Sequence, residues 1–260
     1  MKYKNIIFKI DEHVGVISMN RPDVLNSFNY EMADELLDSL ETCNNNQDIR
    51  AVLIKGEGRA FCAGQDLEEA TRKNGPSIGE IIDHTFNPII KAIDSIDLPV
   101  ICCVNGIAAG AGANLALACD VTFASESAKF IQSFVHIGLV PDTAGTWTLP
   151  RLIGIQKAAG LMFSGDKINA KYAEEIGMIY ACEKDEEVSQ TALDFAKKLS
   201  LLPTKSIAMT KKLLKESHSN SIKDQLDLEK KYQIIAAKSE DHQEGINAFF
   251  EKRKPNYKGK

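Results

Sequence analysis

Along its first two thirds, the chain switches repeatedly between runs of β-branched residues and apolar residues at helical spacing. The β-branched runs predict strands at residues 6–10, 14–19, 51–55, 99–104, 121–124 and 178–181. Apolar residues recurring every three or four positions predict helices at residues 30–42, from 77 to about 93, and at 106–119, with a loop at 44–46. Interleaved strands and helices indicate an α/β fold.

The pattern changes near residue 185. From Glu186 onward only helical spacing is present, and it predicts helices at residues 193–199, 204–214, 222–237 and 240–252. These helices carry apolar side chains that they cannot bury by themselves: Leu226, Tyr232, Ile235, Phe249 and Phe250. We therefore divide the chain into an α/β core, residues 1–185, and a helical region, residues 186–260, that packs on the core or on another subunit.

Composition excludes several classes of function. The 260 residues are 44% hydrophobic and 26% charged, as in ordinary globular proteins. A formal charge of −5 argues against nucleic acid as a partner. Residues 98–119 carry no charge and are long enough to span a bilayer. That run contains Pro99, Asn105 and Asn114, however, and a buried strand followed by a packed helix fits it better.

The six cysteines predict neither a metal site nor disulfides. They form no CxxC pair and no Cys/His spacing of the kind that binds zinc. Cys102 and Cys103 lie in an apolar run, where cysteine behaves as a small hydrophobic residue. With an N-terminus that lacks the apolar core of a signal peptide, this composition predicts a cytoplasmic protein without membrane segments.

The first candidate for chemistry is the segment Phe61–Leu67, which follows a predicted strand and a glycine-containing loop. Asp66 and Glu69 have the spacing of a capping box and predict a helix start. Unpaired N–H groups at a helix start can bind an anion. The alternative is a plain strand–loop–helix corner with a capped end.

The second candidate is the segment Asn105–Asn114, in which small residues let the backbone approach a ligand or a neighbouring helix. Its glycines also imitate the dinucleotide-binding turn of dehydrogenases, and Tyr180 and Lys184 imitate their Tyr-x-x-x-Lys pair. We disfavour that interpretation because the glycine turn follows about a hundred residues, and because Tyr180 falls on a predicted strand.

The third candidate is Asp142, a carboxylate whose neighbours Val140, Pro141 and Trp147 are apolar. Such surroundings raise the affinity of a carboxylate for protons, which suits a general base. The alternative is that Asp142 only caps a helix. No Ser-His-Asp arrangement and no Gly-x-Ser-x-Gly motif is evident.

Several motifs in the right order resemble the crotonase superfamily, also called the enoyl-CoA hydratase/isomerase family. The matching segments are Asn20–Pro22, Leu25–Phe28, Phe61–Leu67, Val104–Asp120, Gly138–Leu152, Glu244–Gly245 and Ala248–Arg253. Within the family, the chain is most similar to the 1,2-epoxyphenylacetyl-CoA isomerase branch. Gln65, the Val140–Asp142 run and the tail at 255–260 carry that similarity.

The resemblance implies a spiral of ββα units with C-terminal helices that build a homotrimer or a homohexamer. It implies an acyl-CoA thioester as substrate and no further cofactor. The N–H groups of Gln65 and Ala111 would form the oxyanion hole. The remaining substrate-binding positions that it implies are Ala63, Asp66, Leu67, Gly110, Phe134, Phe249 and Lys252. Of these, Phe249 and Lys252 match positions that reach the coenzyme of a neighbouring subunit.

Three positions decide which reaction the resemblance implies. Hydratases of this family use two glutamates, and those positions fall on Asn114 and Phe134, whereas Asp142 matches the catalytic acid of isomerase branches. The expected activity is therefore an acyl-CoA isomerase, acting on 2-(1,2-epoxy-1,2-dihydrophenyl)acetyl-CoA or shifting a 3-enoyl-CoA to the 2-enoyl isomer. Asn114 would orient groups in the site. Two alternatives stay open, a hydratase with atypical residues and a non-catalytic acyl-CoA-binding assembly subunit.

Overall fold

The computed structural model describes residues 3–260 and contains two sheets. The larger sheet runs in the order β1 (Ile6–Asp11), β2 (Val14–Met19), β3 (Ala51–Gly56), β5 (Val100–Val104), β7 (Val121–Ser125) and β10 (Ala181–Glu183). Its first two strands form an antiparallel hairpin, and every later pairing is parallel. The smaller sheet runs in the order β4 (Ala60–Cys62), β6 (Ile107–Ala109), β8 (Lys129–Ile131) and β9 (Lys167–Asn169), with only β9 antiparallel.

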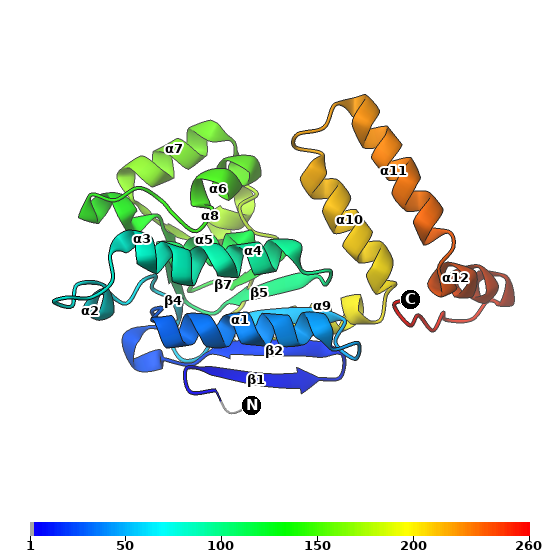
Figure 1. The fold of residues 1–260 in the computed structure, drawn as a ribbon, viewed down its shortest axis with the longest axis horizontal. Coiled ribbons are helices and arrows are strands. Elements are labelled where there is room, and N and C mark those ends of the chain that lie inside the picture. Colours follow the sequence, from blue (N-terminus) through cyan, green and yellow to red (C-terminus); the bar gives the residue numbers. More distant parts are fainter. Residues whose placement is uncertain (1–2) are drawn as a thin grey trace.

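Helices follow these strands along the chain (Figure 1). Those of the first 200 residues are α1 (Tyr30–Asn45), α2 (Leu67–Ala70), α3 (Ile78–Ile81), α4 (Asn87–Ser95), α5 (Ala111–Ala118), α6 (Gly145–Ile153), α7 (Ile155–Ser164), α8 (Ala170–Glu175) and α9 (Val188–Ser200). A π-helical turn, Ile82–Phe86, joins α3 to α4, and 3-10 turns lie at Pro22–Val24 and Ser133–Ile137. The last three helices are α10 (Thr204–Glu216), α11 (Ile222–Ala236) and α12 (Glu240–Glu251).

The chain repeats one structural unit along the core. A strand of the larger sheet is followed by a short strand of the smaller sheet, in the pairs β3–β4, β5–β6 and β7–β8. A helix follows the first two of these pairs and returns the chain to the larger sheet. This arrangement confirms the predicted α/β spiral of ββα units.

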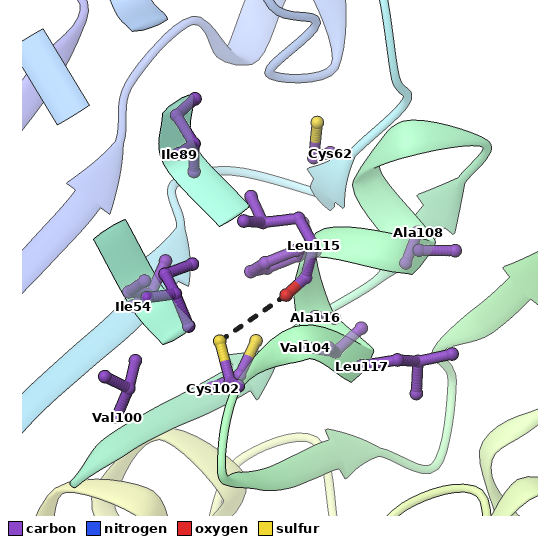
Figure 2. Close-up of a cluster of buried hydrophobic side chains, with 14 of the residues drawn as sticks. Ile54, Cys62, Ile89, Val100, Cys102, Val104, Ala108, Leu115, Ala116 and Leu117 are labelled. Atoms are coloured by element: carbon purple, nitrogen blue, oxygen red, sulfur yellow. Dashed lines mark hydrogen bonds between the residues drawn. The ribbon is translucent and has the colours of Figure 1, made fainter. Parts of the chain in front are cut away.

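Helix α5 occupies the centre of the core. Its residues are small or apolar all round, and those from Ala111 to Leu117 are buried, as expected for a helix enclosed on every side. Figure 2 shows Leu115 between Ile89 of α4 and side chains of β5, including Cys102. On the opposite face of the larger sheet, α9 packs against β3, β5 and β7 and forms a second apolar cluster with them.

Three predicted element boundaries are wrong for local physical reasons. The helix predicted at 106–119 is strand β6 followed by α5, because the chain breaks at Gly110, whose φ is +52°. The loop predicted at 44–46 begins later, since α1 continues through Asn45 with Cys43 buried against the core. The strand predicted at 178–181 begins at Ala181 instead.

Helices α10–α12 stand to one side of the core in Figure 1, and we call residues 204–260 the arm. Buried Arg50 donates hydrogen bonds to Thr204 and to the carbonyls of Leu202 and Tyr257. Lys211 of α10 is buried and pairs with Asp120 at 2.7 Å. The boundary predicted at residue 185 stays a prediction.

The uncharged run at 98–119 is not one helix, because it contains β5, β6 and α5. Across residues 3–260, no helix combines the length and the apolar character that crossing a bilayer requires.

Candidate active site

Two short parallel strands bring the two small-residue motifs together. Strands β4 and β6 pair with Ala60 opposite Ile107 and Cys62 opposite Ala108. Both motifs continue from the carboxyl ends of these strands, which meet at one edge of the sheet, where α/β proteins commonly bind ligands. A Cβ atom on Gly64 would lie 3.6 Å from the amide nitrogen of Ala111. The backbone at Gly64 therefore touches the start of α5.

The N–H groups of Gln65 and Ala111 are available for a ligand. Phe28 pairs with the backbone on either side of Gln65, donating to the Gly64 carbonyl at 2.8 Å and accepting from Asp66 N–H at 2.8 Å. Ala111 is the first residue of α5, where N–H groups have no acceptor within the helix. Within residues 3–260, neither N–H donates to another backbone group. Two such donors at one edge are suited to bind a developing oxyanion.

The helix after the first motif is capped, but without the predicted capping box. Asp66 accepts hydrogen bonds from the N–H groups of Glu68 and Glu69, and its second oxygen pairs with Arg21 at 2.9 Å. The carboxylate of Glu69 accepts from the N–H of Tyr30, at 3.1 Å, and so does not close a box with Asp66. The corner is thus fixed to α1, with Ala63 half-buried beside it and Leu67 exposed.

Asp142 lies half-buried in the loop before α6. The alternative that it caps this helix is wrong, since Ala144 occupies the N-cap position. Burial raises the pKa of the Asp142 carboxyl, and a 2.7 Å hydrogen bond from Thr143 Oγ1 opposes part of that increase. A carboxylate that is poorly solvated in this way accepts a proton more readily than an exposed one.

Asn114 is turned toward the Asp142 loop. Its side chain is 1% exposed, and its Nδ2 donates to the backbone carbonyl of Asp142 at 2.9 Å. Its Oδ1 accepts from Nε2 of Gln132 at 2.8 Å. The approach is close enough that a Cβ on Gly145 would lie 2.2 Å from Asn114 Nδ2. The sequence pattern gave no signal for Gln132, because a buried amide has no characteristic spacing.

Phe134 forms an apolar wall beside the second motif. Its ring is buried, and a Cβ on Gly110 would lie 3.7 Å from its Cζ atom. Phe249 and Lys252 are not brought to this corner by the single chain. Phe249 is 79% exposed on α12, which Figure 1 places in the arm, far from α5.

The remaining candidates do not assemble into a site. Tyr180 is exposed and immediately precedes β10, and Lys184 pairs with Glu187 at 2.9 Å, so the two do not share a helix as a dehydrogenase pair would. Over residues 3–260, no three His, Cys, Asp or Glu side chains are grouped so that they could hold a metal ion. All six cysteines are free thiols, and burial raises the pKa of Cys62 to about 12, so it stays protonated.

Comparison with known proteins identifies the family. A sequence profile described as enoyl-CoA hydratase/isomerase matches residues 9–260. The chain belongs to the enoyl-CoA hydratase/isomerase family. It is 40% identical over 258 residues to a 1,2-epoxyphenylacetyl-CoA isomerase of Escherichia coli, covering 98% of each chain.

Two further relatives show how specifically the comparisons identify the reaction. A probable enoyl-CoA hydratase of Rhodobacter capsulatus is also 40% identical, over 260 residues and 100% of each chain. A crystal structure of an enoyl-CoA hydratase from Bacillus anthracis superposes with a TM-score of 0.95 at 31% identity, covering 99% of this chain and 100% of the other. It follows from these matches that the chain has the crotonase fold and is an enzyme of a family that acts on CoA thioesters. Relatives of equal identity bear names of both reactions, so identity alone does not choose between hydration and isomerisation.

Proposed function

We propose that the protein is an acyl-CoA isomerase in which Asp142 moves a proton between two carbons of the acyl group. The observation that carries the proposal is the half-buried Asp142 carboxyl, whose pKa burial raises, near a corner where Asn114 and Phe134 can neither bind nor release a proton. A hydratase needs two groups that orient and deprotonate water, whereas an allylic shift needs one group that takes a proton and returns it.

The proposed reaction on a 3-enoyl-CoA has two steps. Asp142 removes a proton from C2, and the electron pair forms a dienolate whose negative charge rests on the thioester oxygen. The N–H groups of Gln65 and Ala111 would stabilise that oxygen, and removing one donor of this kind typically costs about 3–4 kcal/mol of barrier. The protonated Asp142 then delivers the proton to C4 as the C2–C3 double bond forms. Water takes no part, consistent with the apolar wall of Phe134.

The acyl group is proposed as a 3-enoyl chain or the ring epoxide of a phenylacetyl thioester. The name of the Escherichia coli relative supports the second choice. Both substrates form an anion next to the same carbonyl. We also propose that Ala63, Asp66, Leu67 and Gly110 line the path of the thioester, and that Phe249 and Lys252 reach the coenzyme from another copy in a trimer or hexamer.

The decisive experiment is Asp142→Asn, with Asp194→Asn as a control because Asp194 is exposed on α9, on the opposite face of the larger sheet from α5. We expect kcat for 3-enoyl-CoA isomerisation to fall about 10²- to 10⁴-fold in the first variant, as is typical when a general base is lost. The control should match the parent. Retention of activity within about tenfold, a barrier change under ~1.4 kcal/mol, would show that Asp142 is not the base.

Parallel assays separate the rival functions. Hydration of crotonyl-CoA that survives Asp142→Asn would support a hydratase with atypical residues. Binding of acyl-CoA with no Asp142-dependent turnover of any substrate would support an assembly subunit. A panel of acyl-CoA substrates that includes the phenylacetyl epoxide, followed by mass spectrometry and deuterium incorporation, identifies the acyl group.

A further inference from the structure

Buried Gln132 and its neighbour Ile131 connect the two halves of the candidate active site, which are the turn before Ala111 and the loop of Asp142. Ile131 accepts the backbone hydrogen bond of Gly110 N–H at 2.9 Å, directly beside the proposed oxyanion donor Ala111. The next residue, Gln132, donates from its side chain to Asn114, which in turn donates to the backbone carbonyl of Asp142. Two consecutive residues are therefore bonded to the turn that carries the oxyanion donor and, through Asn114, to the loop that carries the base.

The direction of each amide in this chain is fixed by its partner. Asn114 has two partners that specify the same orientation, because the carbonyl of Asp142 accepts from Nδ2 while Gln132 donates to Oδ1. Gln132 must then present Nε2 to Asn114, which leaves its own Oε1 on the other side. That oxygen is buried and finds no hydrogen-bond partner in the part of the chain that the structure describes.

An unpaired buried acceptor is costly, typically about 1–3 kcal/mol. Gln132 is 3% exposed, so water does not freely compensate for it. A purely structural position would be occupied at lower cost by an apolar side chain, so a buried amide here calls for an explanation. The hydrogen bond that it donates to Asn114 supplies one.

We propose that Gln132 is a positioning residue that holds Asn114 in the amide orientation needed to fix the Asp142 loop against the Ala111 turn. The proposal rests on the proposed function, because it concerns the placement of Asp142 for proton transfer. Gln132 itself does not touch the reacting atoms. Its effect passes through the amide of Asn114, and a displacement of about 1 Å in a catalytic group is enough to cost about a hundredfold in rate.

The test is Gln132→Met, which keeps the length and much of the volume of the side chain but removes its donor. We expect kcat for isomerisation to fall about 10- to 100-fold while KM changes little, since thioester binding does not require the Asp142 loop to be aligned. The melting temperature should stay within a few degrees of the parent, because the variant loses one hydrogen bond and exchanges one unpaired buried acceptor, Gln132 Oε1, for another, Asn114 Oδ1.

The matched control is Thr122→Val, which removes a single buried hydrogen bond, from Thr122 Oγ1 to the Ala116 carbonyl at the far end of α5. It should leave kcat and KM unchanged. A double-mutant cycle gives the second readout. In an Asn114→Ala background Gln132→Met should lower kcat no further, because the two residues act in series. Independent, multiplicative losses would overturn the proposal.

Crystal structures of the variants supply a measurement that does not depend on activity. In Gln132→Met the contact between Asn114 Nδ2 and the Asp142 carbonyl should be lost, and in Thr122→Val it should persist. An intact contact in Gln132→Met, or a lost contact with unchanged kcat, refutes the inference. If the parent shows no Asp142-dependent turnover, the proposed function fails, and the crystallographic comparison alone decides whether Gln132 sets the Asn114 amide.

Discussion

The core and the arm are held in their places by different forces. In the core, strands β2 and β5 are buried along their whole length, and one continuous apolar cluster reaches from β1 to α8. In the arm, α11 has no buried residue at all, and the side chains of Phe249 and Phe250 face outward. The polar contacts that attach the arm to the core include the buried cations Arg50 and Lys211 and exposed ion pairs on α10, where Ala208 and Met209 are also buried.

The two regions therefore owe their shapes to different interactions. Burial of apolar area stabilises the core. The arm is oriented by a few directional polar contacts, while its apolar faces stay available for a partner. Between α10 and the core, a groove of about 850 Å³ is lined by apolar side chains such as Trp147, Leu152 and Leu214. In the trimer or hexamer proposed above, another copy would cover faces of this kind.

The largest effect is expected from a matched pair of phenylalanine truncations. Phe28 is 1% exposed and packs edge-to-face on Phe86 in the core, so Phe28→Ala should lower the free energy of unfolding by about 3–5 kcal/mol. Phe249→Ala, in a dilute sample of the single chain, should change it by less than about 0.5 kcal/mol. Urea unfolding followed by circular dichroism measures both. A comparable loss in the two variants would erase the distinction between core and arm.

An intermediate effect is expected from the cation that anchors α10. Lys211 donates to Asp120 and to the carbonyls of Ile93 and Leu98. Lys211→Met removes the partner of both carbonyls and leaves Asp120 with the N–H of Val100. It should cost about 2–3 kcal/mol, less than for a fully buried pair because Asp120 is partly exposed. Its neighbour Lys212 makes an exposed pair with Asp97, and Lys212→Met should cost less than about 0.5 kcal/mol.

Hydrogen exchange locates the effect of Lys211→Met. Faster exchange should be confined to α10–α12, with the core strands protected as in the parent. Faster exchange throughout the sheet would mean that this ion pair supports the core as well, and the arm would no longer be a separately anchored region.

The smallest effect is expected from Asp142, a core position where charge rather than packing limits stability. Burial raises the pKa of Asp142 in the folded chain, so the folded state retains the proton more strongly than the unfolded state. Below the unfolded value of 3.8 both states are protonated; as the pH rises through the folded-state pKa, the native carboxyl ionises in poor solvation and stability is lost.

Asp142→Asn removes that charge and should raise the melting temperature at pH 7 by less than about 4 °C. The gain should vanish near pH 3, where the parent carboxyl is neutral in both states. Calorimetry of parent and variant at the two pH values makes the comparison. A variant that is less stable at pH 7 would show that ionised Asp142 stabilises the fold.

The sequence predicted most of the long elements well, because hydrophobic periodicity is a local signal. The hairpin at 6–19, helix α1 and the capping box at Ser77 appear as expected. Three-residue strands such as β4 and β8 are too short to show periodicity, and their pairing depends on distant partners. Residues 106–110 were predicted as part of a helix, because small residues fit both helical and strand patterns.

The candidate site divides in the same way. Gln65, Ala111 and Asp142 lie in motifs and could be proposed from the residues and the resemblance. The contact of Gln132 with Asn114, and with it the orientation of Asn114, depends on a hydrogen bond between residues 18 positions apart. No sequence periodicity of amide side chains predicts such a bond. Tertiary hydrogen bonding between buried amides is therefore the part of the site that required coordinates.

The hydrogen bond from Arg50 to the carbonyl of Tyr257 spans 207 residues. On the ribosome, the core strands emerge and can collapse long before that carbonyl exists. Until translation has passed residue 257, the guanidinium of Arg50 lacks this acceptor, whereas its bonds to Leu202 and Thr204 and the bond of Lys211 to Asp120 can form earlier.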